Sequence, residues 1–283
     1  MTIHPSRRNF LGAAAGAAGL SALSPFRASA VIEPEPSGIK LGIATYSLRS
    51  FDRPTAIAML KKLQVKYLSI KDQFHLKQEL SPDELRAARK EFDDAGFTVT
   101  SGGNVDMSKG ATIEYLRPKF EYAKNAGLPM MVCAPTHENM KNVEALVKEY
   151  NIRIAIHNHG PEDKHFPSPE SVLEVVNKLD KRCGLCMDIG HATRAGSDVV
   201  KCAAIAGDRL FDMHVKDLRT KTDKDSQCDI GDGILPFPAL FKQLKKMGYT
   251  GCVNMEYEIN AKDPMVGMQR SLSYMRGVLA GLA

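Results

Sequence analysis

Four residues of this sequence have side chains that bind metal ions and stand near the ends of β-like runs: His157, Asp188, His214 and Glu256. Successive members are 31, 26 and 42 residues apart, about one strand–helix unit each. Two imidazoles and two carboxylates, without a thiolate, suit Mn²⁺, Zn²⁺, Co²⁺ or Fe²⁺ better than Ca²⁺, which prefers oxygen ligands. A single His or Asp at a strand end is usually a hydrogen-bonded loop anchor. Four at equivalent positions predict a site for one divalent metal ion.

The elements that would position these residues are short β-like runs, which alternate with longer helical stretches from residue 39 onward. Strands are expected at 39–45, 65–71, 97–102, 129–134, 152–158, 184–190, 210–217 and 252–258. Helices are expected between them, for example at 54–63, 82–95, 113–126 and 168–179. Ser81, Pro82 and Glu84 have the residue types of a helix start, with a capping serine, a proline in the first turn and a glutamate three positions after the serine.

The junctions from helix to strand repeat as well. Gly96, Gly127, Asn151 and Gly248 each lie where a left-handed residue lets the chain turn from a helix into the next strand. Repeated βα units are typical of a parallel sheet with crossover helices. Eight units predict the α/β class and a single (β/α)8 TIM barrel. An open doubly wound sheet is the alternative, but no G-x-G-x-x-G fingerprint follows the first strand.

In such a barrel, catalytic side chains come from the carboxyl ends of the strands, where all the βα loops converge. Strands five to eight would therefore bring His157, Asp188, His214 and Glu256 into one mouth. This expectation follows from the order of the strands and does not depend on any resemblance to known proteins.

Three segments, "GLCMDIGHA", "FDMHVKD" and "VNMEYE", resemble the xylose-isomerase-like TIM barrels (AP endonuclease family 2-like) of the sugar-phosphate isomerase/epimerase superfamily. The similarity runs from residue 39 to about residue 280 and is most specific over 154–160 and 186–258. The superfamily includes tagatose 3-epimerase-like enzymes, inosose dehydratases and, more distantly, endonuclease IV. The resemblance implies one divalent ion, usually manganese, held by Glu, Asp, His and Glu from strands five to eight.

The sequence departs from the family pattern in "IHNHG", where His157 replaces the usual glutamate of strand five. His159 is then the outward-facing histidine of the family and is expected to contact the substrate. In the epimerases, two glutamates exchange protons on opposite faces of the carbon next to a carbonyl, which the metal polarises. A metal-bound His157 has no free lone pair. Glu256 would then be the single base that abstracts the proton. Such one-base chemistry would be an isomerisation, a dehydration or a lyase-type cleavage of a keto sugar.

Five further residues are expected at the mouth. His191 matches a histidine that the family uses against its substrate, so it would be a second acid/base or bind a hydroxyl. Lys216 would reach a substrate oxygen as a catalytic group. Lys71 and His75 follow the second strand and would line the substrate site. Glu258 faces the same way as the base if the last strand continues. The alternatives are a structural histidine, a solvated lysine and a carboxylate that pairs with a base.

The N-terminal segment has the features of an export signal. Arg7 and Arg8 precede an apolar run rich in Ala and Gly, and "ASA" supplies the small residues of a cleavage site. The paired arginines, with Phe10 and Leu11 after them, resemble the twin-arginine (Tat) type. The Tat machinery would thus deliver a folded, metal-loaded protein to the periplasm or beyond. The predicted parts are a signal peptide at 1–30, a linker at 31–38 and the barrel at 39–283.

Charge and composition argue against other partners. The chain has 38 basic and 33 acidic residues, and removal of the predicted signal, which holds three arginines and no acid, leaves 35 and 33. This balance, the absence of tryptophan and the lack of a basic run interleaved with aromatics argue against nucleic acid, and so against an endonuclease IV-like nuclease. No apolar run reaches the roughly 20 residues that span a bilayer, so no stable membrane insertion is expected after cleavage.

All six cysteines lie in the predicted barrel, and Cys133, Cys186 and Cys252 stand in apolar, strand-like contexts that favour free thiols. The "CGLC" spacing leads into a strand, which disfavours a catalytic dithiol. Sugar phosphates are scarce outside the cytoplasm, so the expected small-molecule substrate is a non-phosphorylated sugar, a glycoside or a keto sugar. A metal-containing sugar-binding protein without catalysis is the alternative. A monomer and a dimer remain equally open.

Overall fold

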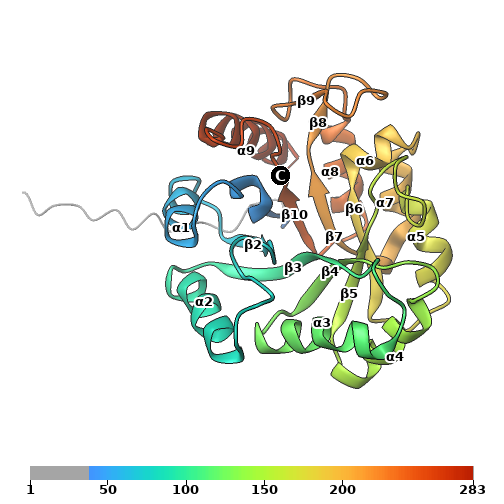
Figure 1. Ribbon diagram of the computed structural model, residues 1–283. Coiled ribbons are helices and arrows are strands. Elements are labelled where there is room, and N and C mark those ends of the chain that lie inside the picture. The colour runs from blue at the N-terminus through green and yellow to red at the C-terminus, as the bar shows by residue number, and fades with distance from the viewer. Residues whose placement is uncertain (1–37, 283) are drawn as a thin grey trace, which may run out of the picture. The chain divides into compact units, whose positions relative to one another are not determined.

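The computed structural model describes residues 38–282, in which eight parallel strands close into a barrel (Figure 1). Around the barrel β1 pairs with β2 on one side and with β10 on the other. The predicted (β/α)8 barrel is confirmed, whereas the predicted signal peptide and all but the last residue of the linker lie outside the described residues. The barrel strands are β1 Lys40–Ala44, β2 Tyr67–Ile70, β3 Thr98–Asp106, β4 Met130–Ala134, β5 Arg153–His157, β6 Cys183–Asp188, β7 Leu210–Val215 and β10 Cys252–Met255.

Helices follow the strands and cover the outside of the barrel (Figure 1). The predicted start of the second helix is present as a capping box, in which Ser81 and Glu84 each accept the other's backbone N–H. The predicted turning residues Gly96, Gly127 and Asn151 all have positive φ angles, of 90°, 60° and 50°. The helices are α1 Arg53–Lys62, α2 Pro82–Asp94, α3 Ile113–Asn125, α4 Met140–Tyr150, α5 Pro169–Val176, α6 Ile189–Arg194, α7 Val199–Ala206, α8 Phe237–Lys246 and α9 Met265–Ala280.

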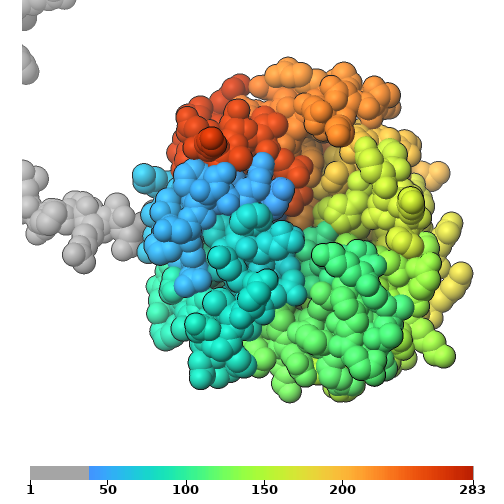
Figure 2. Space-filling model, in the orientation of Figure 1, coloured from blue at the N-terminus to red at the C-terminus, as the bar shows by residue number. Residues whose placement is uncertain are grey.

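The two ends of the barrel sequence lie side by side. The register pairs Lys40 of β1 with Cys252 of β10 and Ile43 with Met255. Figure 2 shows the same arrangement at the surface, where the blue N-terminal part of the barrel abuts the red C-terminal part. The last strand of the barrel is therefore held by the first, which completes the ring.

The barrel has two apolar regions because side chains alternate between the two faces of each strand. The larger core fills the space between the strands and the helices. A smaller cluster formed by Met130, Val132, Ala155, Cys186 and Phe211 is separate from it. Of these residues, Ala155 and Cys186 precede His157 and Asp188 by two positions, so they point to the same side of the sheet as the predicted ligands.

A buried polar group continues this layer on the other strands. Asp212 accepts hydrogen bonds from Ser101 Oγ at 2.6 Å and from Asn254 Nδ2 at 2.7 Å. Burial raises the pKa of Asp212 to about 6, against the opposing effect of the nearby His214. Asp212 stands two residues before His214 on β7, so the same alternation turns His214 to the side of the sheet on which Asp212 lies.

Three strands end two or three residues earlier than predicted. Asp188 ends β6 and caps α6, so "IGHA" is helical. Asp217–Leu218 leaves the barrel as β8 and pairs with β9, Gln227–Cys228, in a separate hairpin. The last barrel strand ends at Met255, which places Glu256 and Glu258 in the following loop. Within residues 38–282, none of the helices has the length and apolar character needed to cross a bilayer.

Asp217 holds the segment that connects the hairpin to α8. Its buried carboxylate accepts backbone N–H groups from Leu218, Gly231, Gly233 and Leu235 at 2.9 to 3.2 Å. Substitution Asp217→Ala would leave four donors without their acceptor. Each unsatisfied donor costs about 1–3 kcal/mol when buried.

We expect Asp217→Ala to lower the free energy of unfolding by about 3 kcal/mol or more, measured by urea denaturation. The matched control is Asp208→Ala at an exposed position, where the change should stay within about 0.5 kcal/mol. Equal losses for the two variants would show that Asp217 does not hold this segment.

Candidate metal centre and substrate pocket

The four predicted ligands meet at one end of the barrel. The register pairs Asp188 directly with His214, and His214 with Asn254, two residues before Glu256. One ligand atom from each of the four residues lies within 4.8 Å of those of the others. His157 Nε2 is 3.1 Å from His214 Nδ1 and 3.5 Å from Asp188 Oδ2, and His214 Nδ1 is 3.4 Å from Glu256 Oε1. The structure thus brings together the residues that the sequence placed on four strands.

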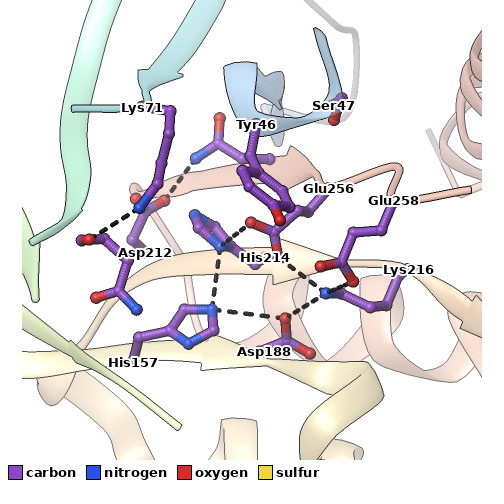
Figure 3. Close-up of polar contacts among 12 residues, drawn as sticks. Tyr46, Ser47, Lys71, His157, Asp188, Asp212, His214, Lys216, Glu256 and Glu258 are labelled. Carbon is purple, nitrogen blue, oxygen red and sulfur yellow. Dashed lines mark hydrogen bonds and ion pairs between the residues drawn. The ribbon is translucent and has the colours of Figure 1, made fainter. Parts of the chain in front are cut away.

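Asp188 is oriented by its neighbours so that one oxygen faces the group. Its Oδ1 accepts the N–H of His191 at 2.8 Å, as the cap of α6. Asn158 binds the backbone of Asp188 twice, by donating to its carbonyl at 3.0 Å and accepting from its N–H at 2.9 Å. The remaining oxygen, Oδ2, points toward His157 (Figure 3). Asn158 therefore fixes the end of β6 from β5.

The backbone that carries Glu256 is held from both sides, beyond the end of β10. On one side, Ser47 Oγ donates to Met255 O at 3.3 Å and accepts from Tyr257 N at 2.8 Å. On the other side, Gln227 Nε2 donates to Glu256 O at 3.0 Å, and Gln227 Oε1 accepts the backbone N–H two residues later at 2.9 Å. These bonds replace the sheet ladder where the strand ends.

Lys216 points its ammonium group at three carboxylates (Figure 3). Its Nζ lies 3.1 Å from Asp188 Oδ2 and 2.8 Å from Glu256 Oε2, and it also contacts Glu258. Lys216 is 4% exposed. The structure therefore places Lys216 as the counter-ion of the candidate ligands. The sequence predicted a contact with a substrate oxygen, and the structure adds these ion pairs with three carboxylates of the protein.

Burial and Lys216 act in opposite directions on these acids. Burial opposes ionisation of Asp188 and Glu256, but the Lys216 ammonium and neighbouring histidines hold the pKa of both carboxyls well below its usual range. Burial raises the pKa of Glu258, and Lys216 only partly offsets this. Burial also lowers the pKa of His157 to about 3, so its ring is neutral at pH 7. The carboxylates and His157 are thus in the form that binds metals. Glu256 raises the pKa of His214 against the opposing effect of burial, so an ion would compete with a proton at that ring.

The residues present fit a divalent ion. Three carboxylates and one ammonium leave a net charge of −2, which a dication would neutralise. His157 Nδ1, Asp188 Oδ2 and His214 Nε2 are buried without a hydrogen-bond partner within residues 38–282. The atoms that face one another are the other ring nitrogens, His157 Nε2 and His214 Nδ1, with Asp188 Oδ2 and Glu256 Oε1, and their contacts are 3.1 to 3.5 Å. Ligands about 2.0–2.2 Å from an ion lie roughly 3–4 Å apart, which matches these contacts.

Two cavities open beside this group. The inner cavity has a volume of about 300 Å³ and is lined by the ligands His157 and Glu256 together with Tyr46, Lys71 and Asn104. The outer cavity has a volume of about 690 Å³ and lies toward the β8–β9 hairpin. Both cavities share the same dividing residues, which are His159, His191 and Glu258.

The two dividing histidines have complementary hydrogen bonds. His159 Nδ1 faces Asp163 Oδ2 at 3.4 Å, and its Nε2 lies 2.8 Å from Asn104 Nδ2, so the proton belongs on Nδ1. Arg194 Nη1 donates to His191 Nδ1 at 3.4 Å, which leaves the proton of His191 on Nε2. Burial lowers the pKa of His191 to about 4. One ring therefore accepts at Nε2 and the other donates.

The other predicted mouth residues differ in their placement. Lys71 lines the inner cavity, where it donates to Asn104 O at 2.9 Å and pairs with Asp72 at 3.0 Å. His75 is fully buried, its ring nitrogens lie 3.0 Å from Thr45 Oγ1 and 3.2 Å from Phe51 O, and within residues 38–282 it lines neither cavity. The structure thus does not bring His75 to the mouth, because its segment turns back against the loop after β1.

Several residues of the site were missed in the sequence. Asn104 stands near the end of β3, which extends four residues beyond the predicted strand, and this position was a usable signal. Four others lie in short elements or a loop and follow no periodic pattern: Tyr46 in a 3-10 turn, Asp163 in a loop, Arg194 in α6 and Gln227 in the two-residue β9. The six cysteines, all within the described part of the chain, are free and buried, and burial raises the pKa of Cys183 to about 12, so "CGLC" carries no reactive thiolate.

Residues 57–278 match the family described as xylose isomerase-like TIM barrel. An inosose dehydratase of Mesomycoplasma hyopneumoniae is 24% identical over 152 residues, which cover 47% of this chain and 50% of that protein. The chain therefore spans about half the length of the curated relatives that it matches.

Two solved structures have the same fold. The 3-keto-D-glucoside 4-epimerase YcjR from E. coli has a TM-score of 0.69 at 16% identity, covering 84% of this chain and 99% of that one. The IolI protein with a bound zinc atom also has a TM-score of 0.69, at 18% identity, covering 86% of this chain and 99% of that one. The family match extends over most of the described barrel and includes all four candidate ligands. This chain belongs to the xylose isomerase-like TIM barrel family.

Proposed function

We propose that this protein is a metal-dependent enzyme that isomerises, epimerises or dehydrates a keto sugar by removing a proton next to the carbonyl. The observation that carries the proposal is the convergence of His157, Asp188, His214 and Glu256 in one group. Two of these residues, His157 and Glu256, line an inner cavity of about 300 Å³, a volume at the lower end of small-molecule sites. The names of the similar proteins, an inosose dehydratase and a 3-keto-glucoside epimerase, support the same reaction class.

The four converging residues would hold one divalent ion, with Mn²⁺ as our first choice and Zn²⁺, Co²⁺ or Fe²⁺ as alternatives. Their mixed nitrogen and oxygen donors suit these ions, and the zinc atom bound by the similar IolI protein supports a metal ion in this chain as well. When bound, such an ion supplies Lewis-acid polarisation of a carbonyl and its neighbouring hydroxyl.

The side chains around the inner cavity can accept and donate protons. Glu256 is the proposed base, since its carboxylate lines the inner cavity and is fixed by the backbone bonds to Ser47 and Gln227. His191 presents Nε2–H to a substrate oxygen on which charge develops, and remains neutral because burial lowers its pKa to about 4. Glu258 lines both cavities and is a second carboxylate for return of the proton or for a leaving group.

The ring of Tyr46 offers a platform beside this chemistry. Tyr46 lines the inner cavity, its ring centroid lies 6.0 Å from that of Phe74, and Arg49 stacks on it with 4.5 Å between the guanidinium carbon and the ring centroid. Asn104 Oδ1 is buried without a hydrogen-bond partner among the residues that the structure describes, so it is available to a sugar hydroxyl. An apolar face beside polar groups suits a sugar ring.

We also propose that the chain is exported by the Tat route to the periplasm or beyond. The proposal depends on Arg7, Arg8 and the apolar run after them, which all precede the described residues. Export of folded protein is compatible with a site that binds its ion before transport.

The metal proposal is tested with Asp188→Asn. Wild-type protein, dialysed against Mn²⁺ and then against buffer, should retain about one ion per chain by elemental analysis, and Mn²⁺ should raise its Tm. We expect the variant to bind Mn²⁺ at least roughly 100-fold more weakly. Asp163→Asn is the matched control at the mouth, because Asp163 is outside the ligand group. Equal Mn²⁺ affinity in Asp188→Asn and wild type would exclude the proposed centre.

The chemistry is tested by incubating metal-loaded protein in D₂O with a panel of ketoses and 3-keto-glycosides. Deuterium should enter beside the carbonyl, and Glu256→Gln should slow its entry about 10³-fold. The metal content of the variant is measured in parallel, so that loss of the ion is distinguished from loss of the base. Glu162→Gln, at the exposed rim, is the control. Exchange within tenfold of wild type in metal-loaded Glu256→Gln would exclude Glu256 as the base, and no exchange with any sugar despite bound metal would favour a sugar-binding protein.

The export proposal is tested with the double substitution of Arg7 and Arg8 by lysine. We expect uncleaved precursor to accumulate in the cytoplasm of a Tat-competent bacterium, as seen by cell fractionation and mass determination of the N-terminus. Arg27→Lys keeps the arginine pair and should leave export intact. Continued export of the double variant would contradict the Tat route.

A further inference from the structure

The outer cavity is larger than a simple entrance to the inner cavity needs to be. Its volume of about 690 Å³ is within the range of about 300–1,000 Å³ that small-molecule sites occupy, and the function proposed above already assigns the reacting ring to the inner cavity of about 300 Å³. His159, His191 and Glu258 belong to both walls, so a ligand in one cavity is adjacent to a ligand in the other.

The charges of the outer cavity indicate what kind of group it accepts. Its basic side chains are Arg194, Lys216 and Lys224, and its acidic ones are Glu162, Asp163, Asp225 and Glu258. Two of the three cations are already engaged, because Arg194 pairs with Glu162 and Lys216 contacts three carboxylates. A phosphate or carboxylate would meet more negative than positive charge there. Neutral hydroxyl groups, which both donate and accept hydrogen bonds, match this mixture.

The outer cavity also has an unmet hydrogen-bond donor and an apolar side. Arg194 is 9% exposed in its side chain, and its Nε is buried with no hydrogen-bond partner in the described part of the chain. A buried donor without an acceptor is costly, so a ligand oxygen near Arg194 would be stabilising. Leu218 and Ile259 give the same cavity an apolar surface against which the face of a second ring can pack.

We propose that the outer cavity is a second sugar subsite, so that the substrate is a keto-glycoside of at least two rings rather than a free keto monosaccharide. The oxidised ring occupies the inner cavity beside the candidate ligands, and the neutral, hydroxyl-rich second ring lies between Arg194, Lys224 and Ile259. This proposal rests on the keto-sugar function proposed above, and it adds the size and charge of the substrate.

The experiment compares 3-ketoglucose with the 3-keto derivatives of cellobiose and maltose, as deuterium exchange catalysed by the metal-loaded protein. We expect kcat/KM for at least one keto-disaccharide to exceed that for 3-ketoglucose by about tenfold or more. Ile259→Trp fills the outer cavity and should reduce this preference to about one. Lys224→Ala should reduce it roughly threefold to tenfold, and Lys221→Ala, on the same loop but outside the cavity lining, should not change it.

Binding of unreactive sugars separates this proposal from the proposed chemistry. Calorimetry of glucose, cellobiose and maltose on wild type and Ile259→Trp shows whether the second ring is bound, whether or not any sugar reacts. No exchange with any probe, together with disaccharide binding that Ile259→Trp abolishes, would overturn the chemistry and support the subsite. Equal kcat/KM and equal affinity for one and two rings, unaffected by Ile259→Trp and Lys224→Ala, would overturn the subsite and leave the chemistry standing. Near-UV circular dichroism checks that both variants are folded.

Discussion

The arrangement of the mouth depends on the buried contact of Lys216 with Asp188, Glu256 and Glu258. Three carboxylates in so small a volume repel one another, and burial makes their ionised forms costly. The single ammonium keeps two of them ionised, as the lowered pKa values of Asp188 and Glu256 indicate. With Glu258 also ionised, the one ammonium leaves two negative charges unbalanced, and this excess of negative charge is the physical reason why a dication fits the centre. Lys216, which the sequence predicted as a substrate contact, therefore also has a structural role, because it holds the oxygens of the candidate ligands in place.

The strands and the loops contribute different things to the site. The alternation along β5, β6 and β7 turns His157, Asp188 and His214 to one side of the sheet, and the register pairs Asp188 with His214 two residues beyond the pair of Cys186 and Asp212. Residues outside these three strands supply the hydrogen-bond partners that fix the tautomers of His159 and His191: Asp163 in a loop, Asn104 in β3 and Arg194 in α6. As a result Nε2 of His159 accepts from Asn104, whereas His191 presents an N–H donor to the cavities. The strands place the candidate ligands, and these neighbours determine which protons are available beside them.

Much of the fold and the four candidate ligands could be predicted, because both depend on local patterns. Alternating β-like and helical runs, with Gly96, Gly127 and Asn151 at the turns, were sufficient for the barrel, and barrel topology then brought the strand ends together. The predictions were least accurate where the chain leaves regular structure. His75 turned inward against Thr45 and Phe51, and Gln227 reached Glu256 from a separate hairpin. Such contacts join distant segments through single side chains, and no periodic pattern in the sequence predicts them.

The two-sided support of Glu256 has a consequence for how the chain acquires its site. Ser47 and Tyr257, whose hydrogen bond flanks the acid, are 210 positions apart, and β1 must pair with β10 before that bond can form. Contacts so distant in sequence are entropically costly to close and belong to the slow end of folding. A partly folded chain that already has β5 to β7 in place can present two histidines and an aspartate, but not the fourth ligand in its final position. Full affinity for the ion would then belong to the closed barrel, and the ion would stabilise closure over every incomplete intermediate.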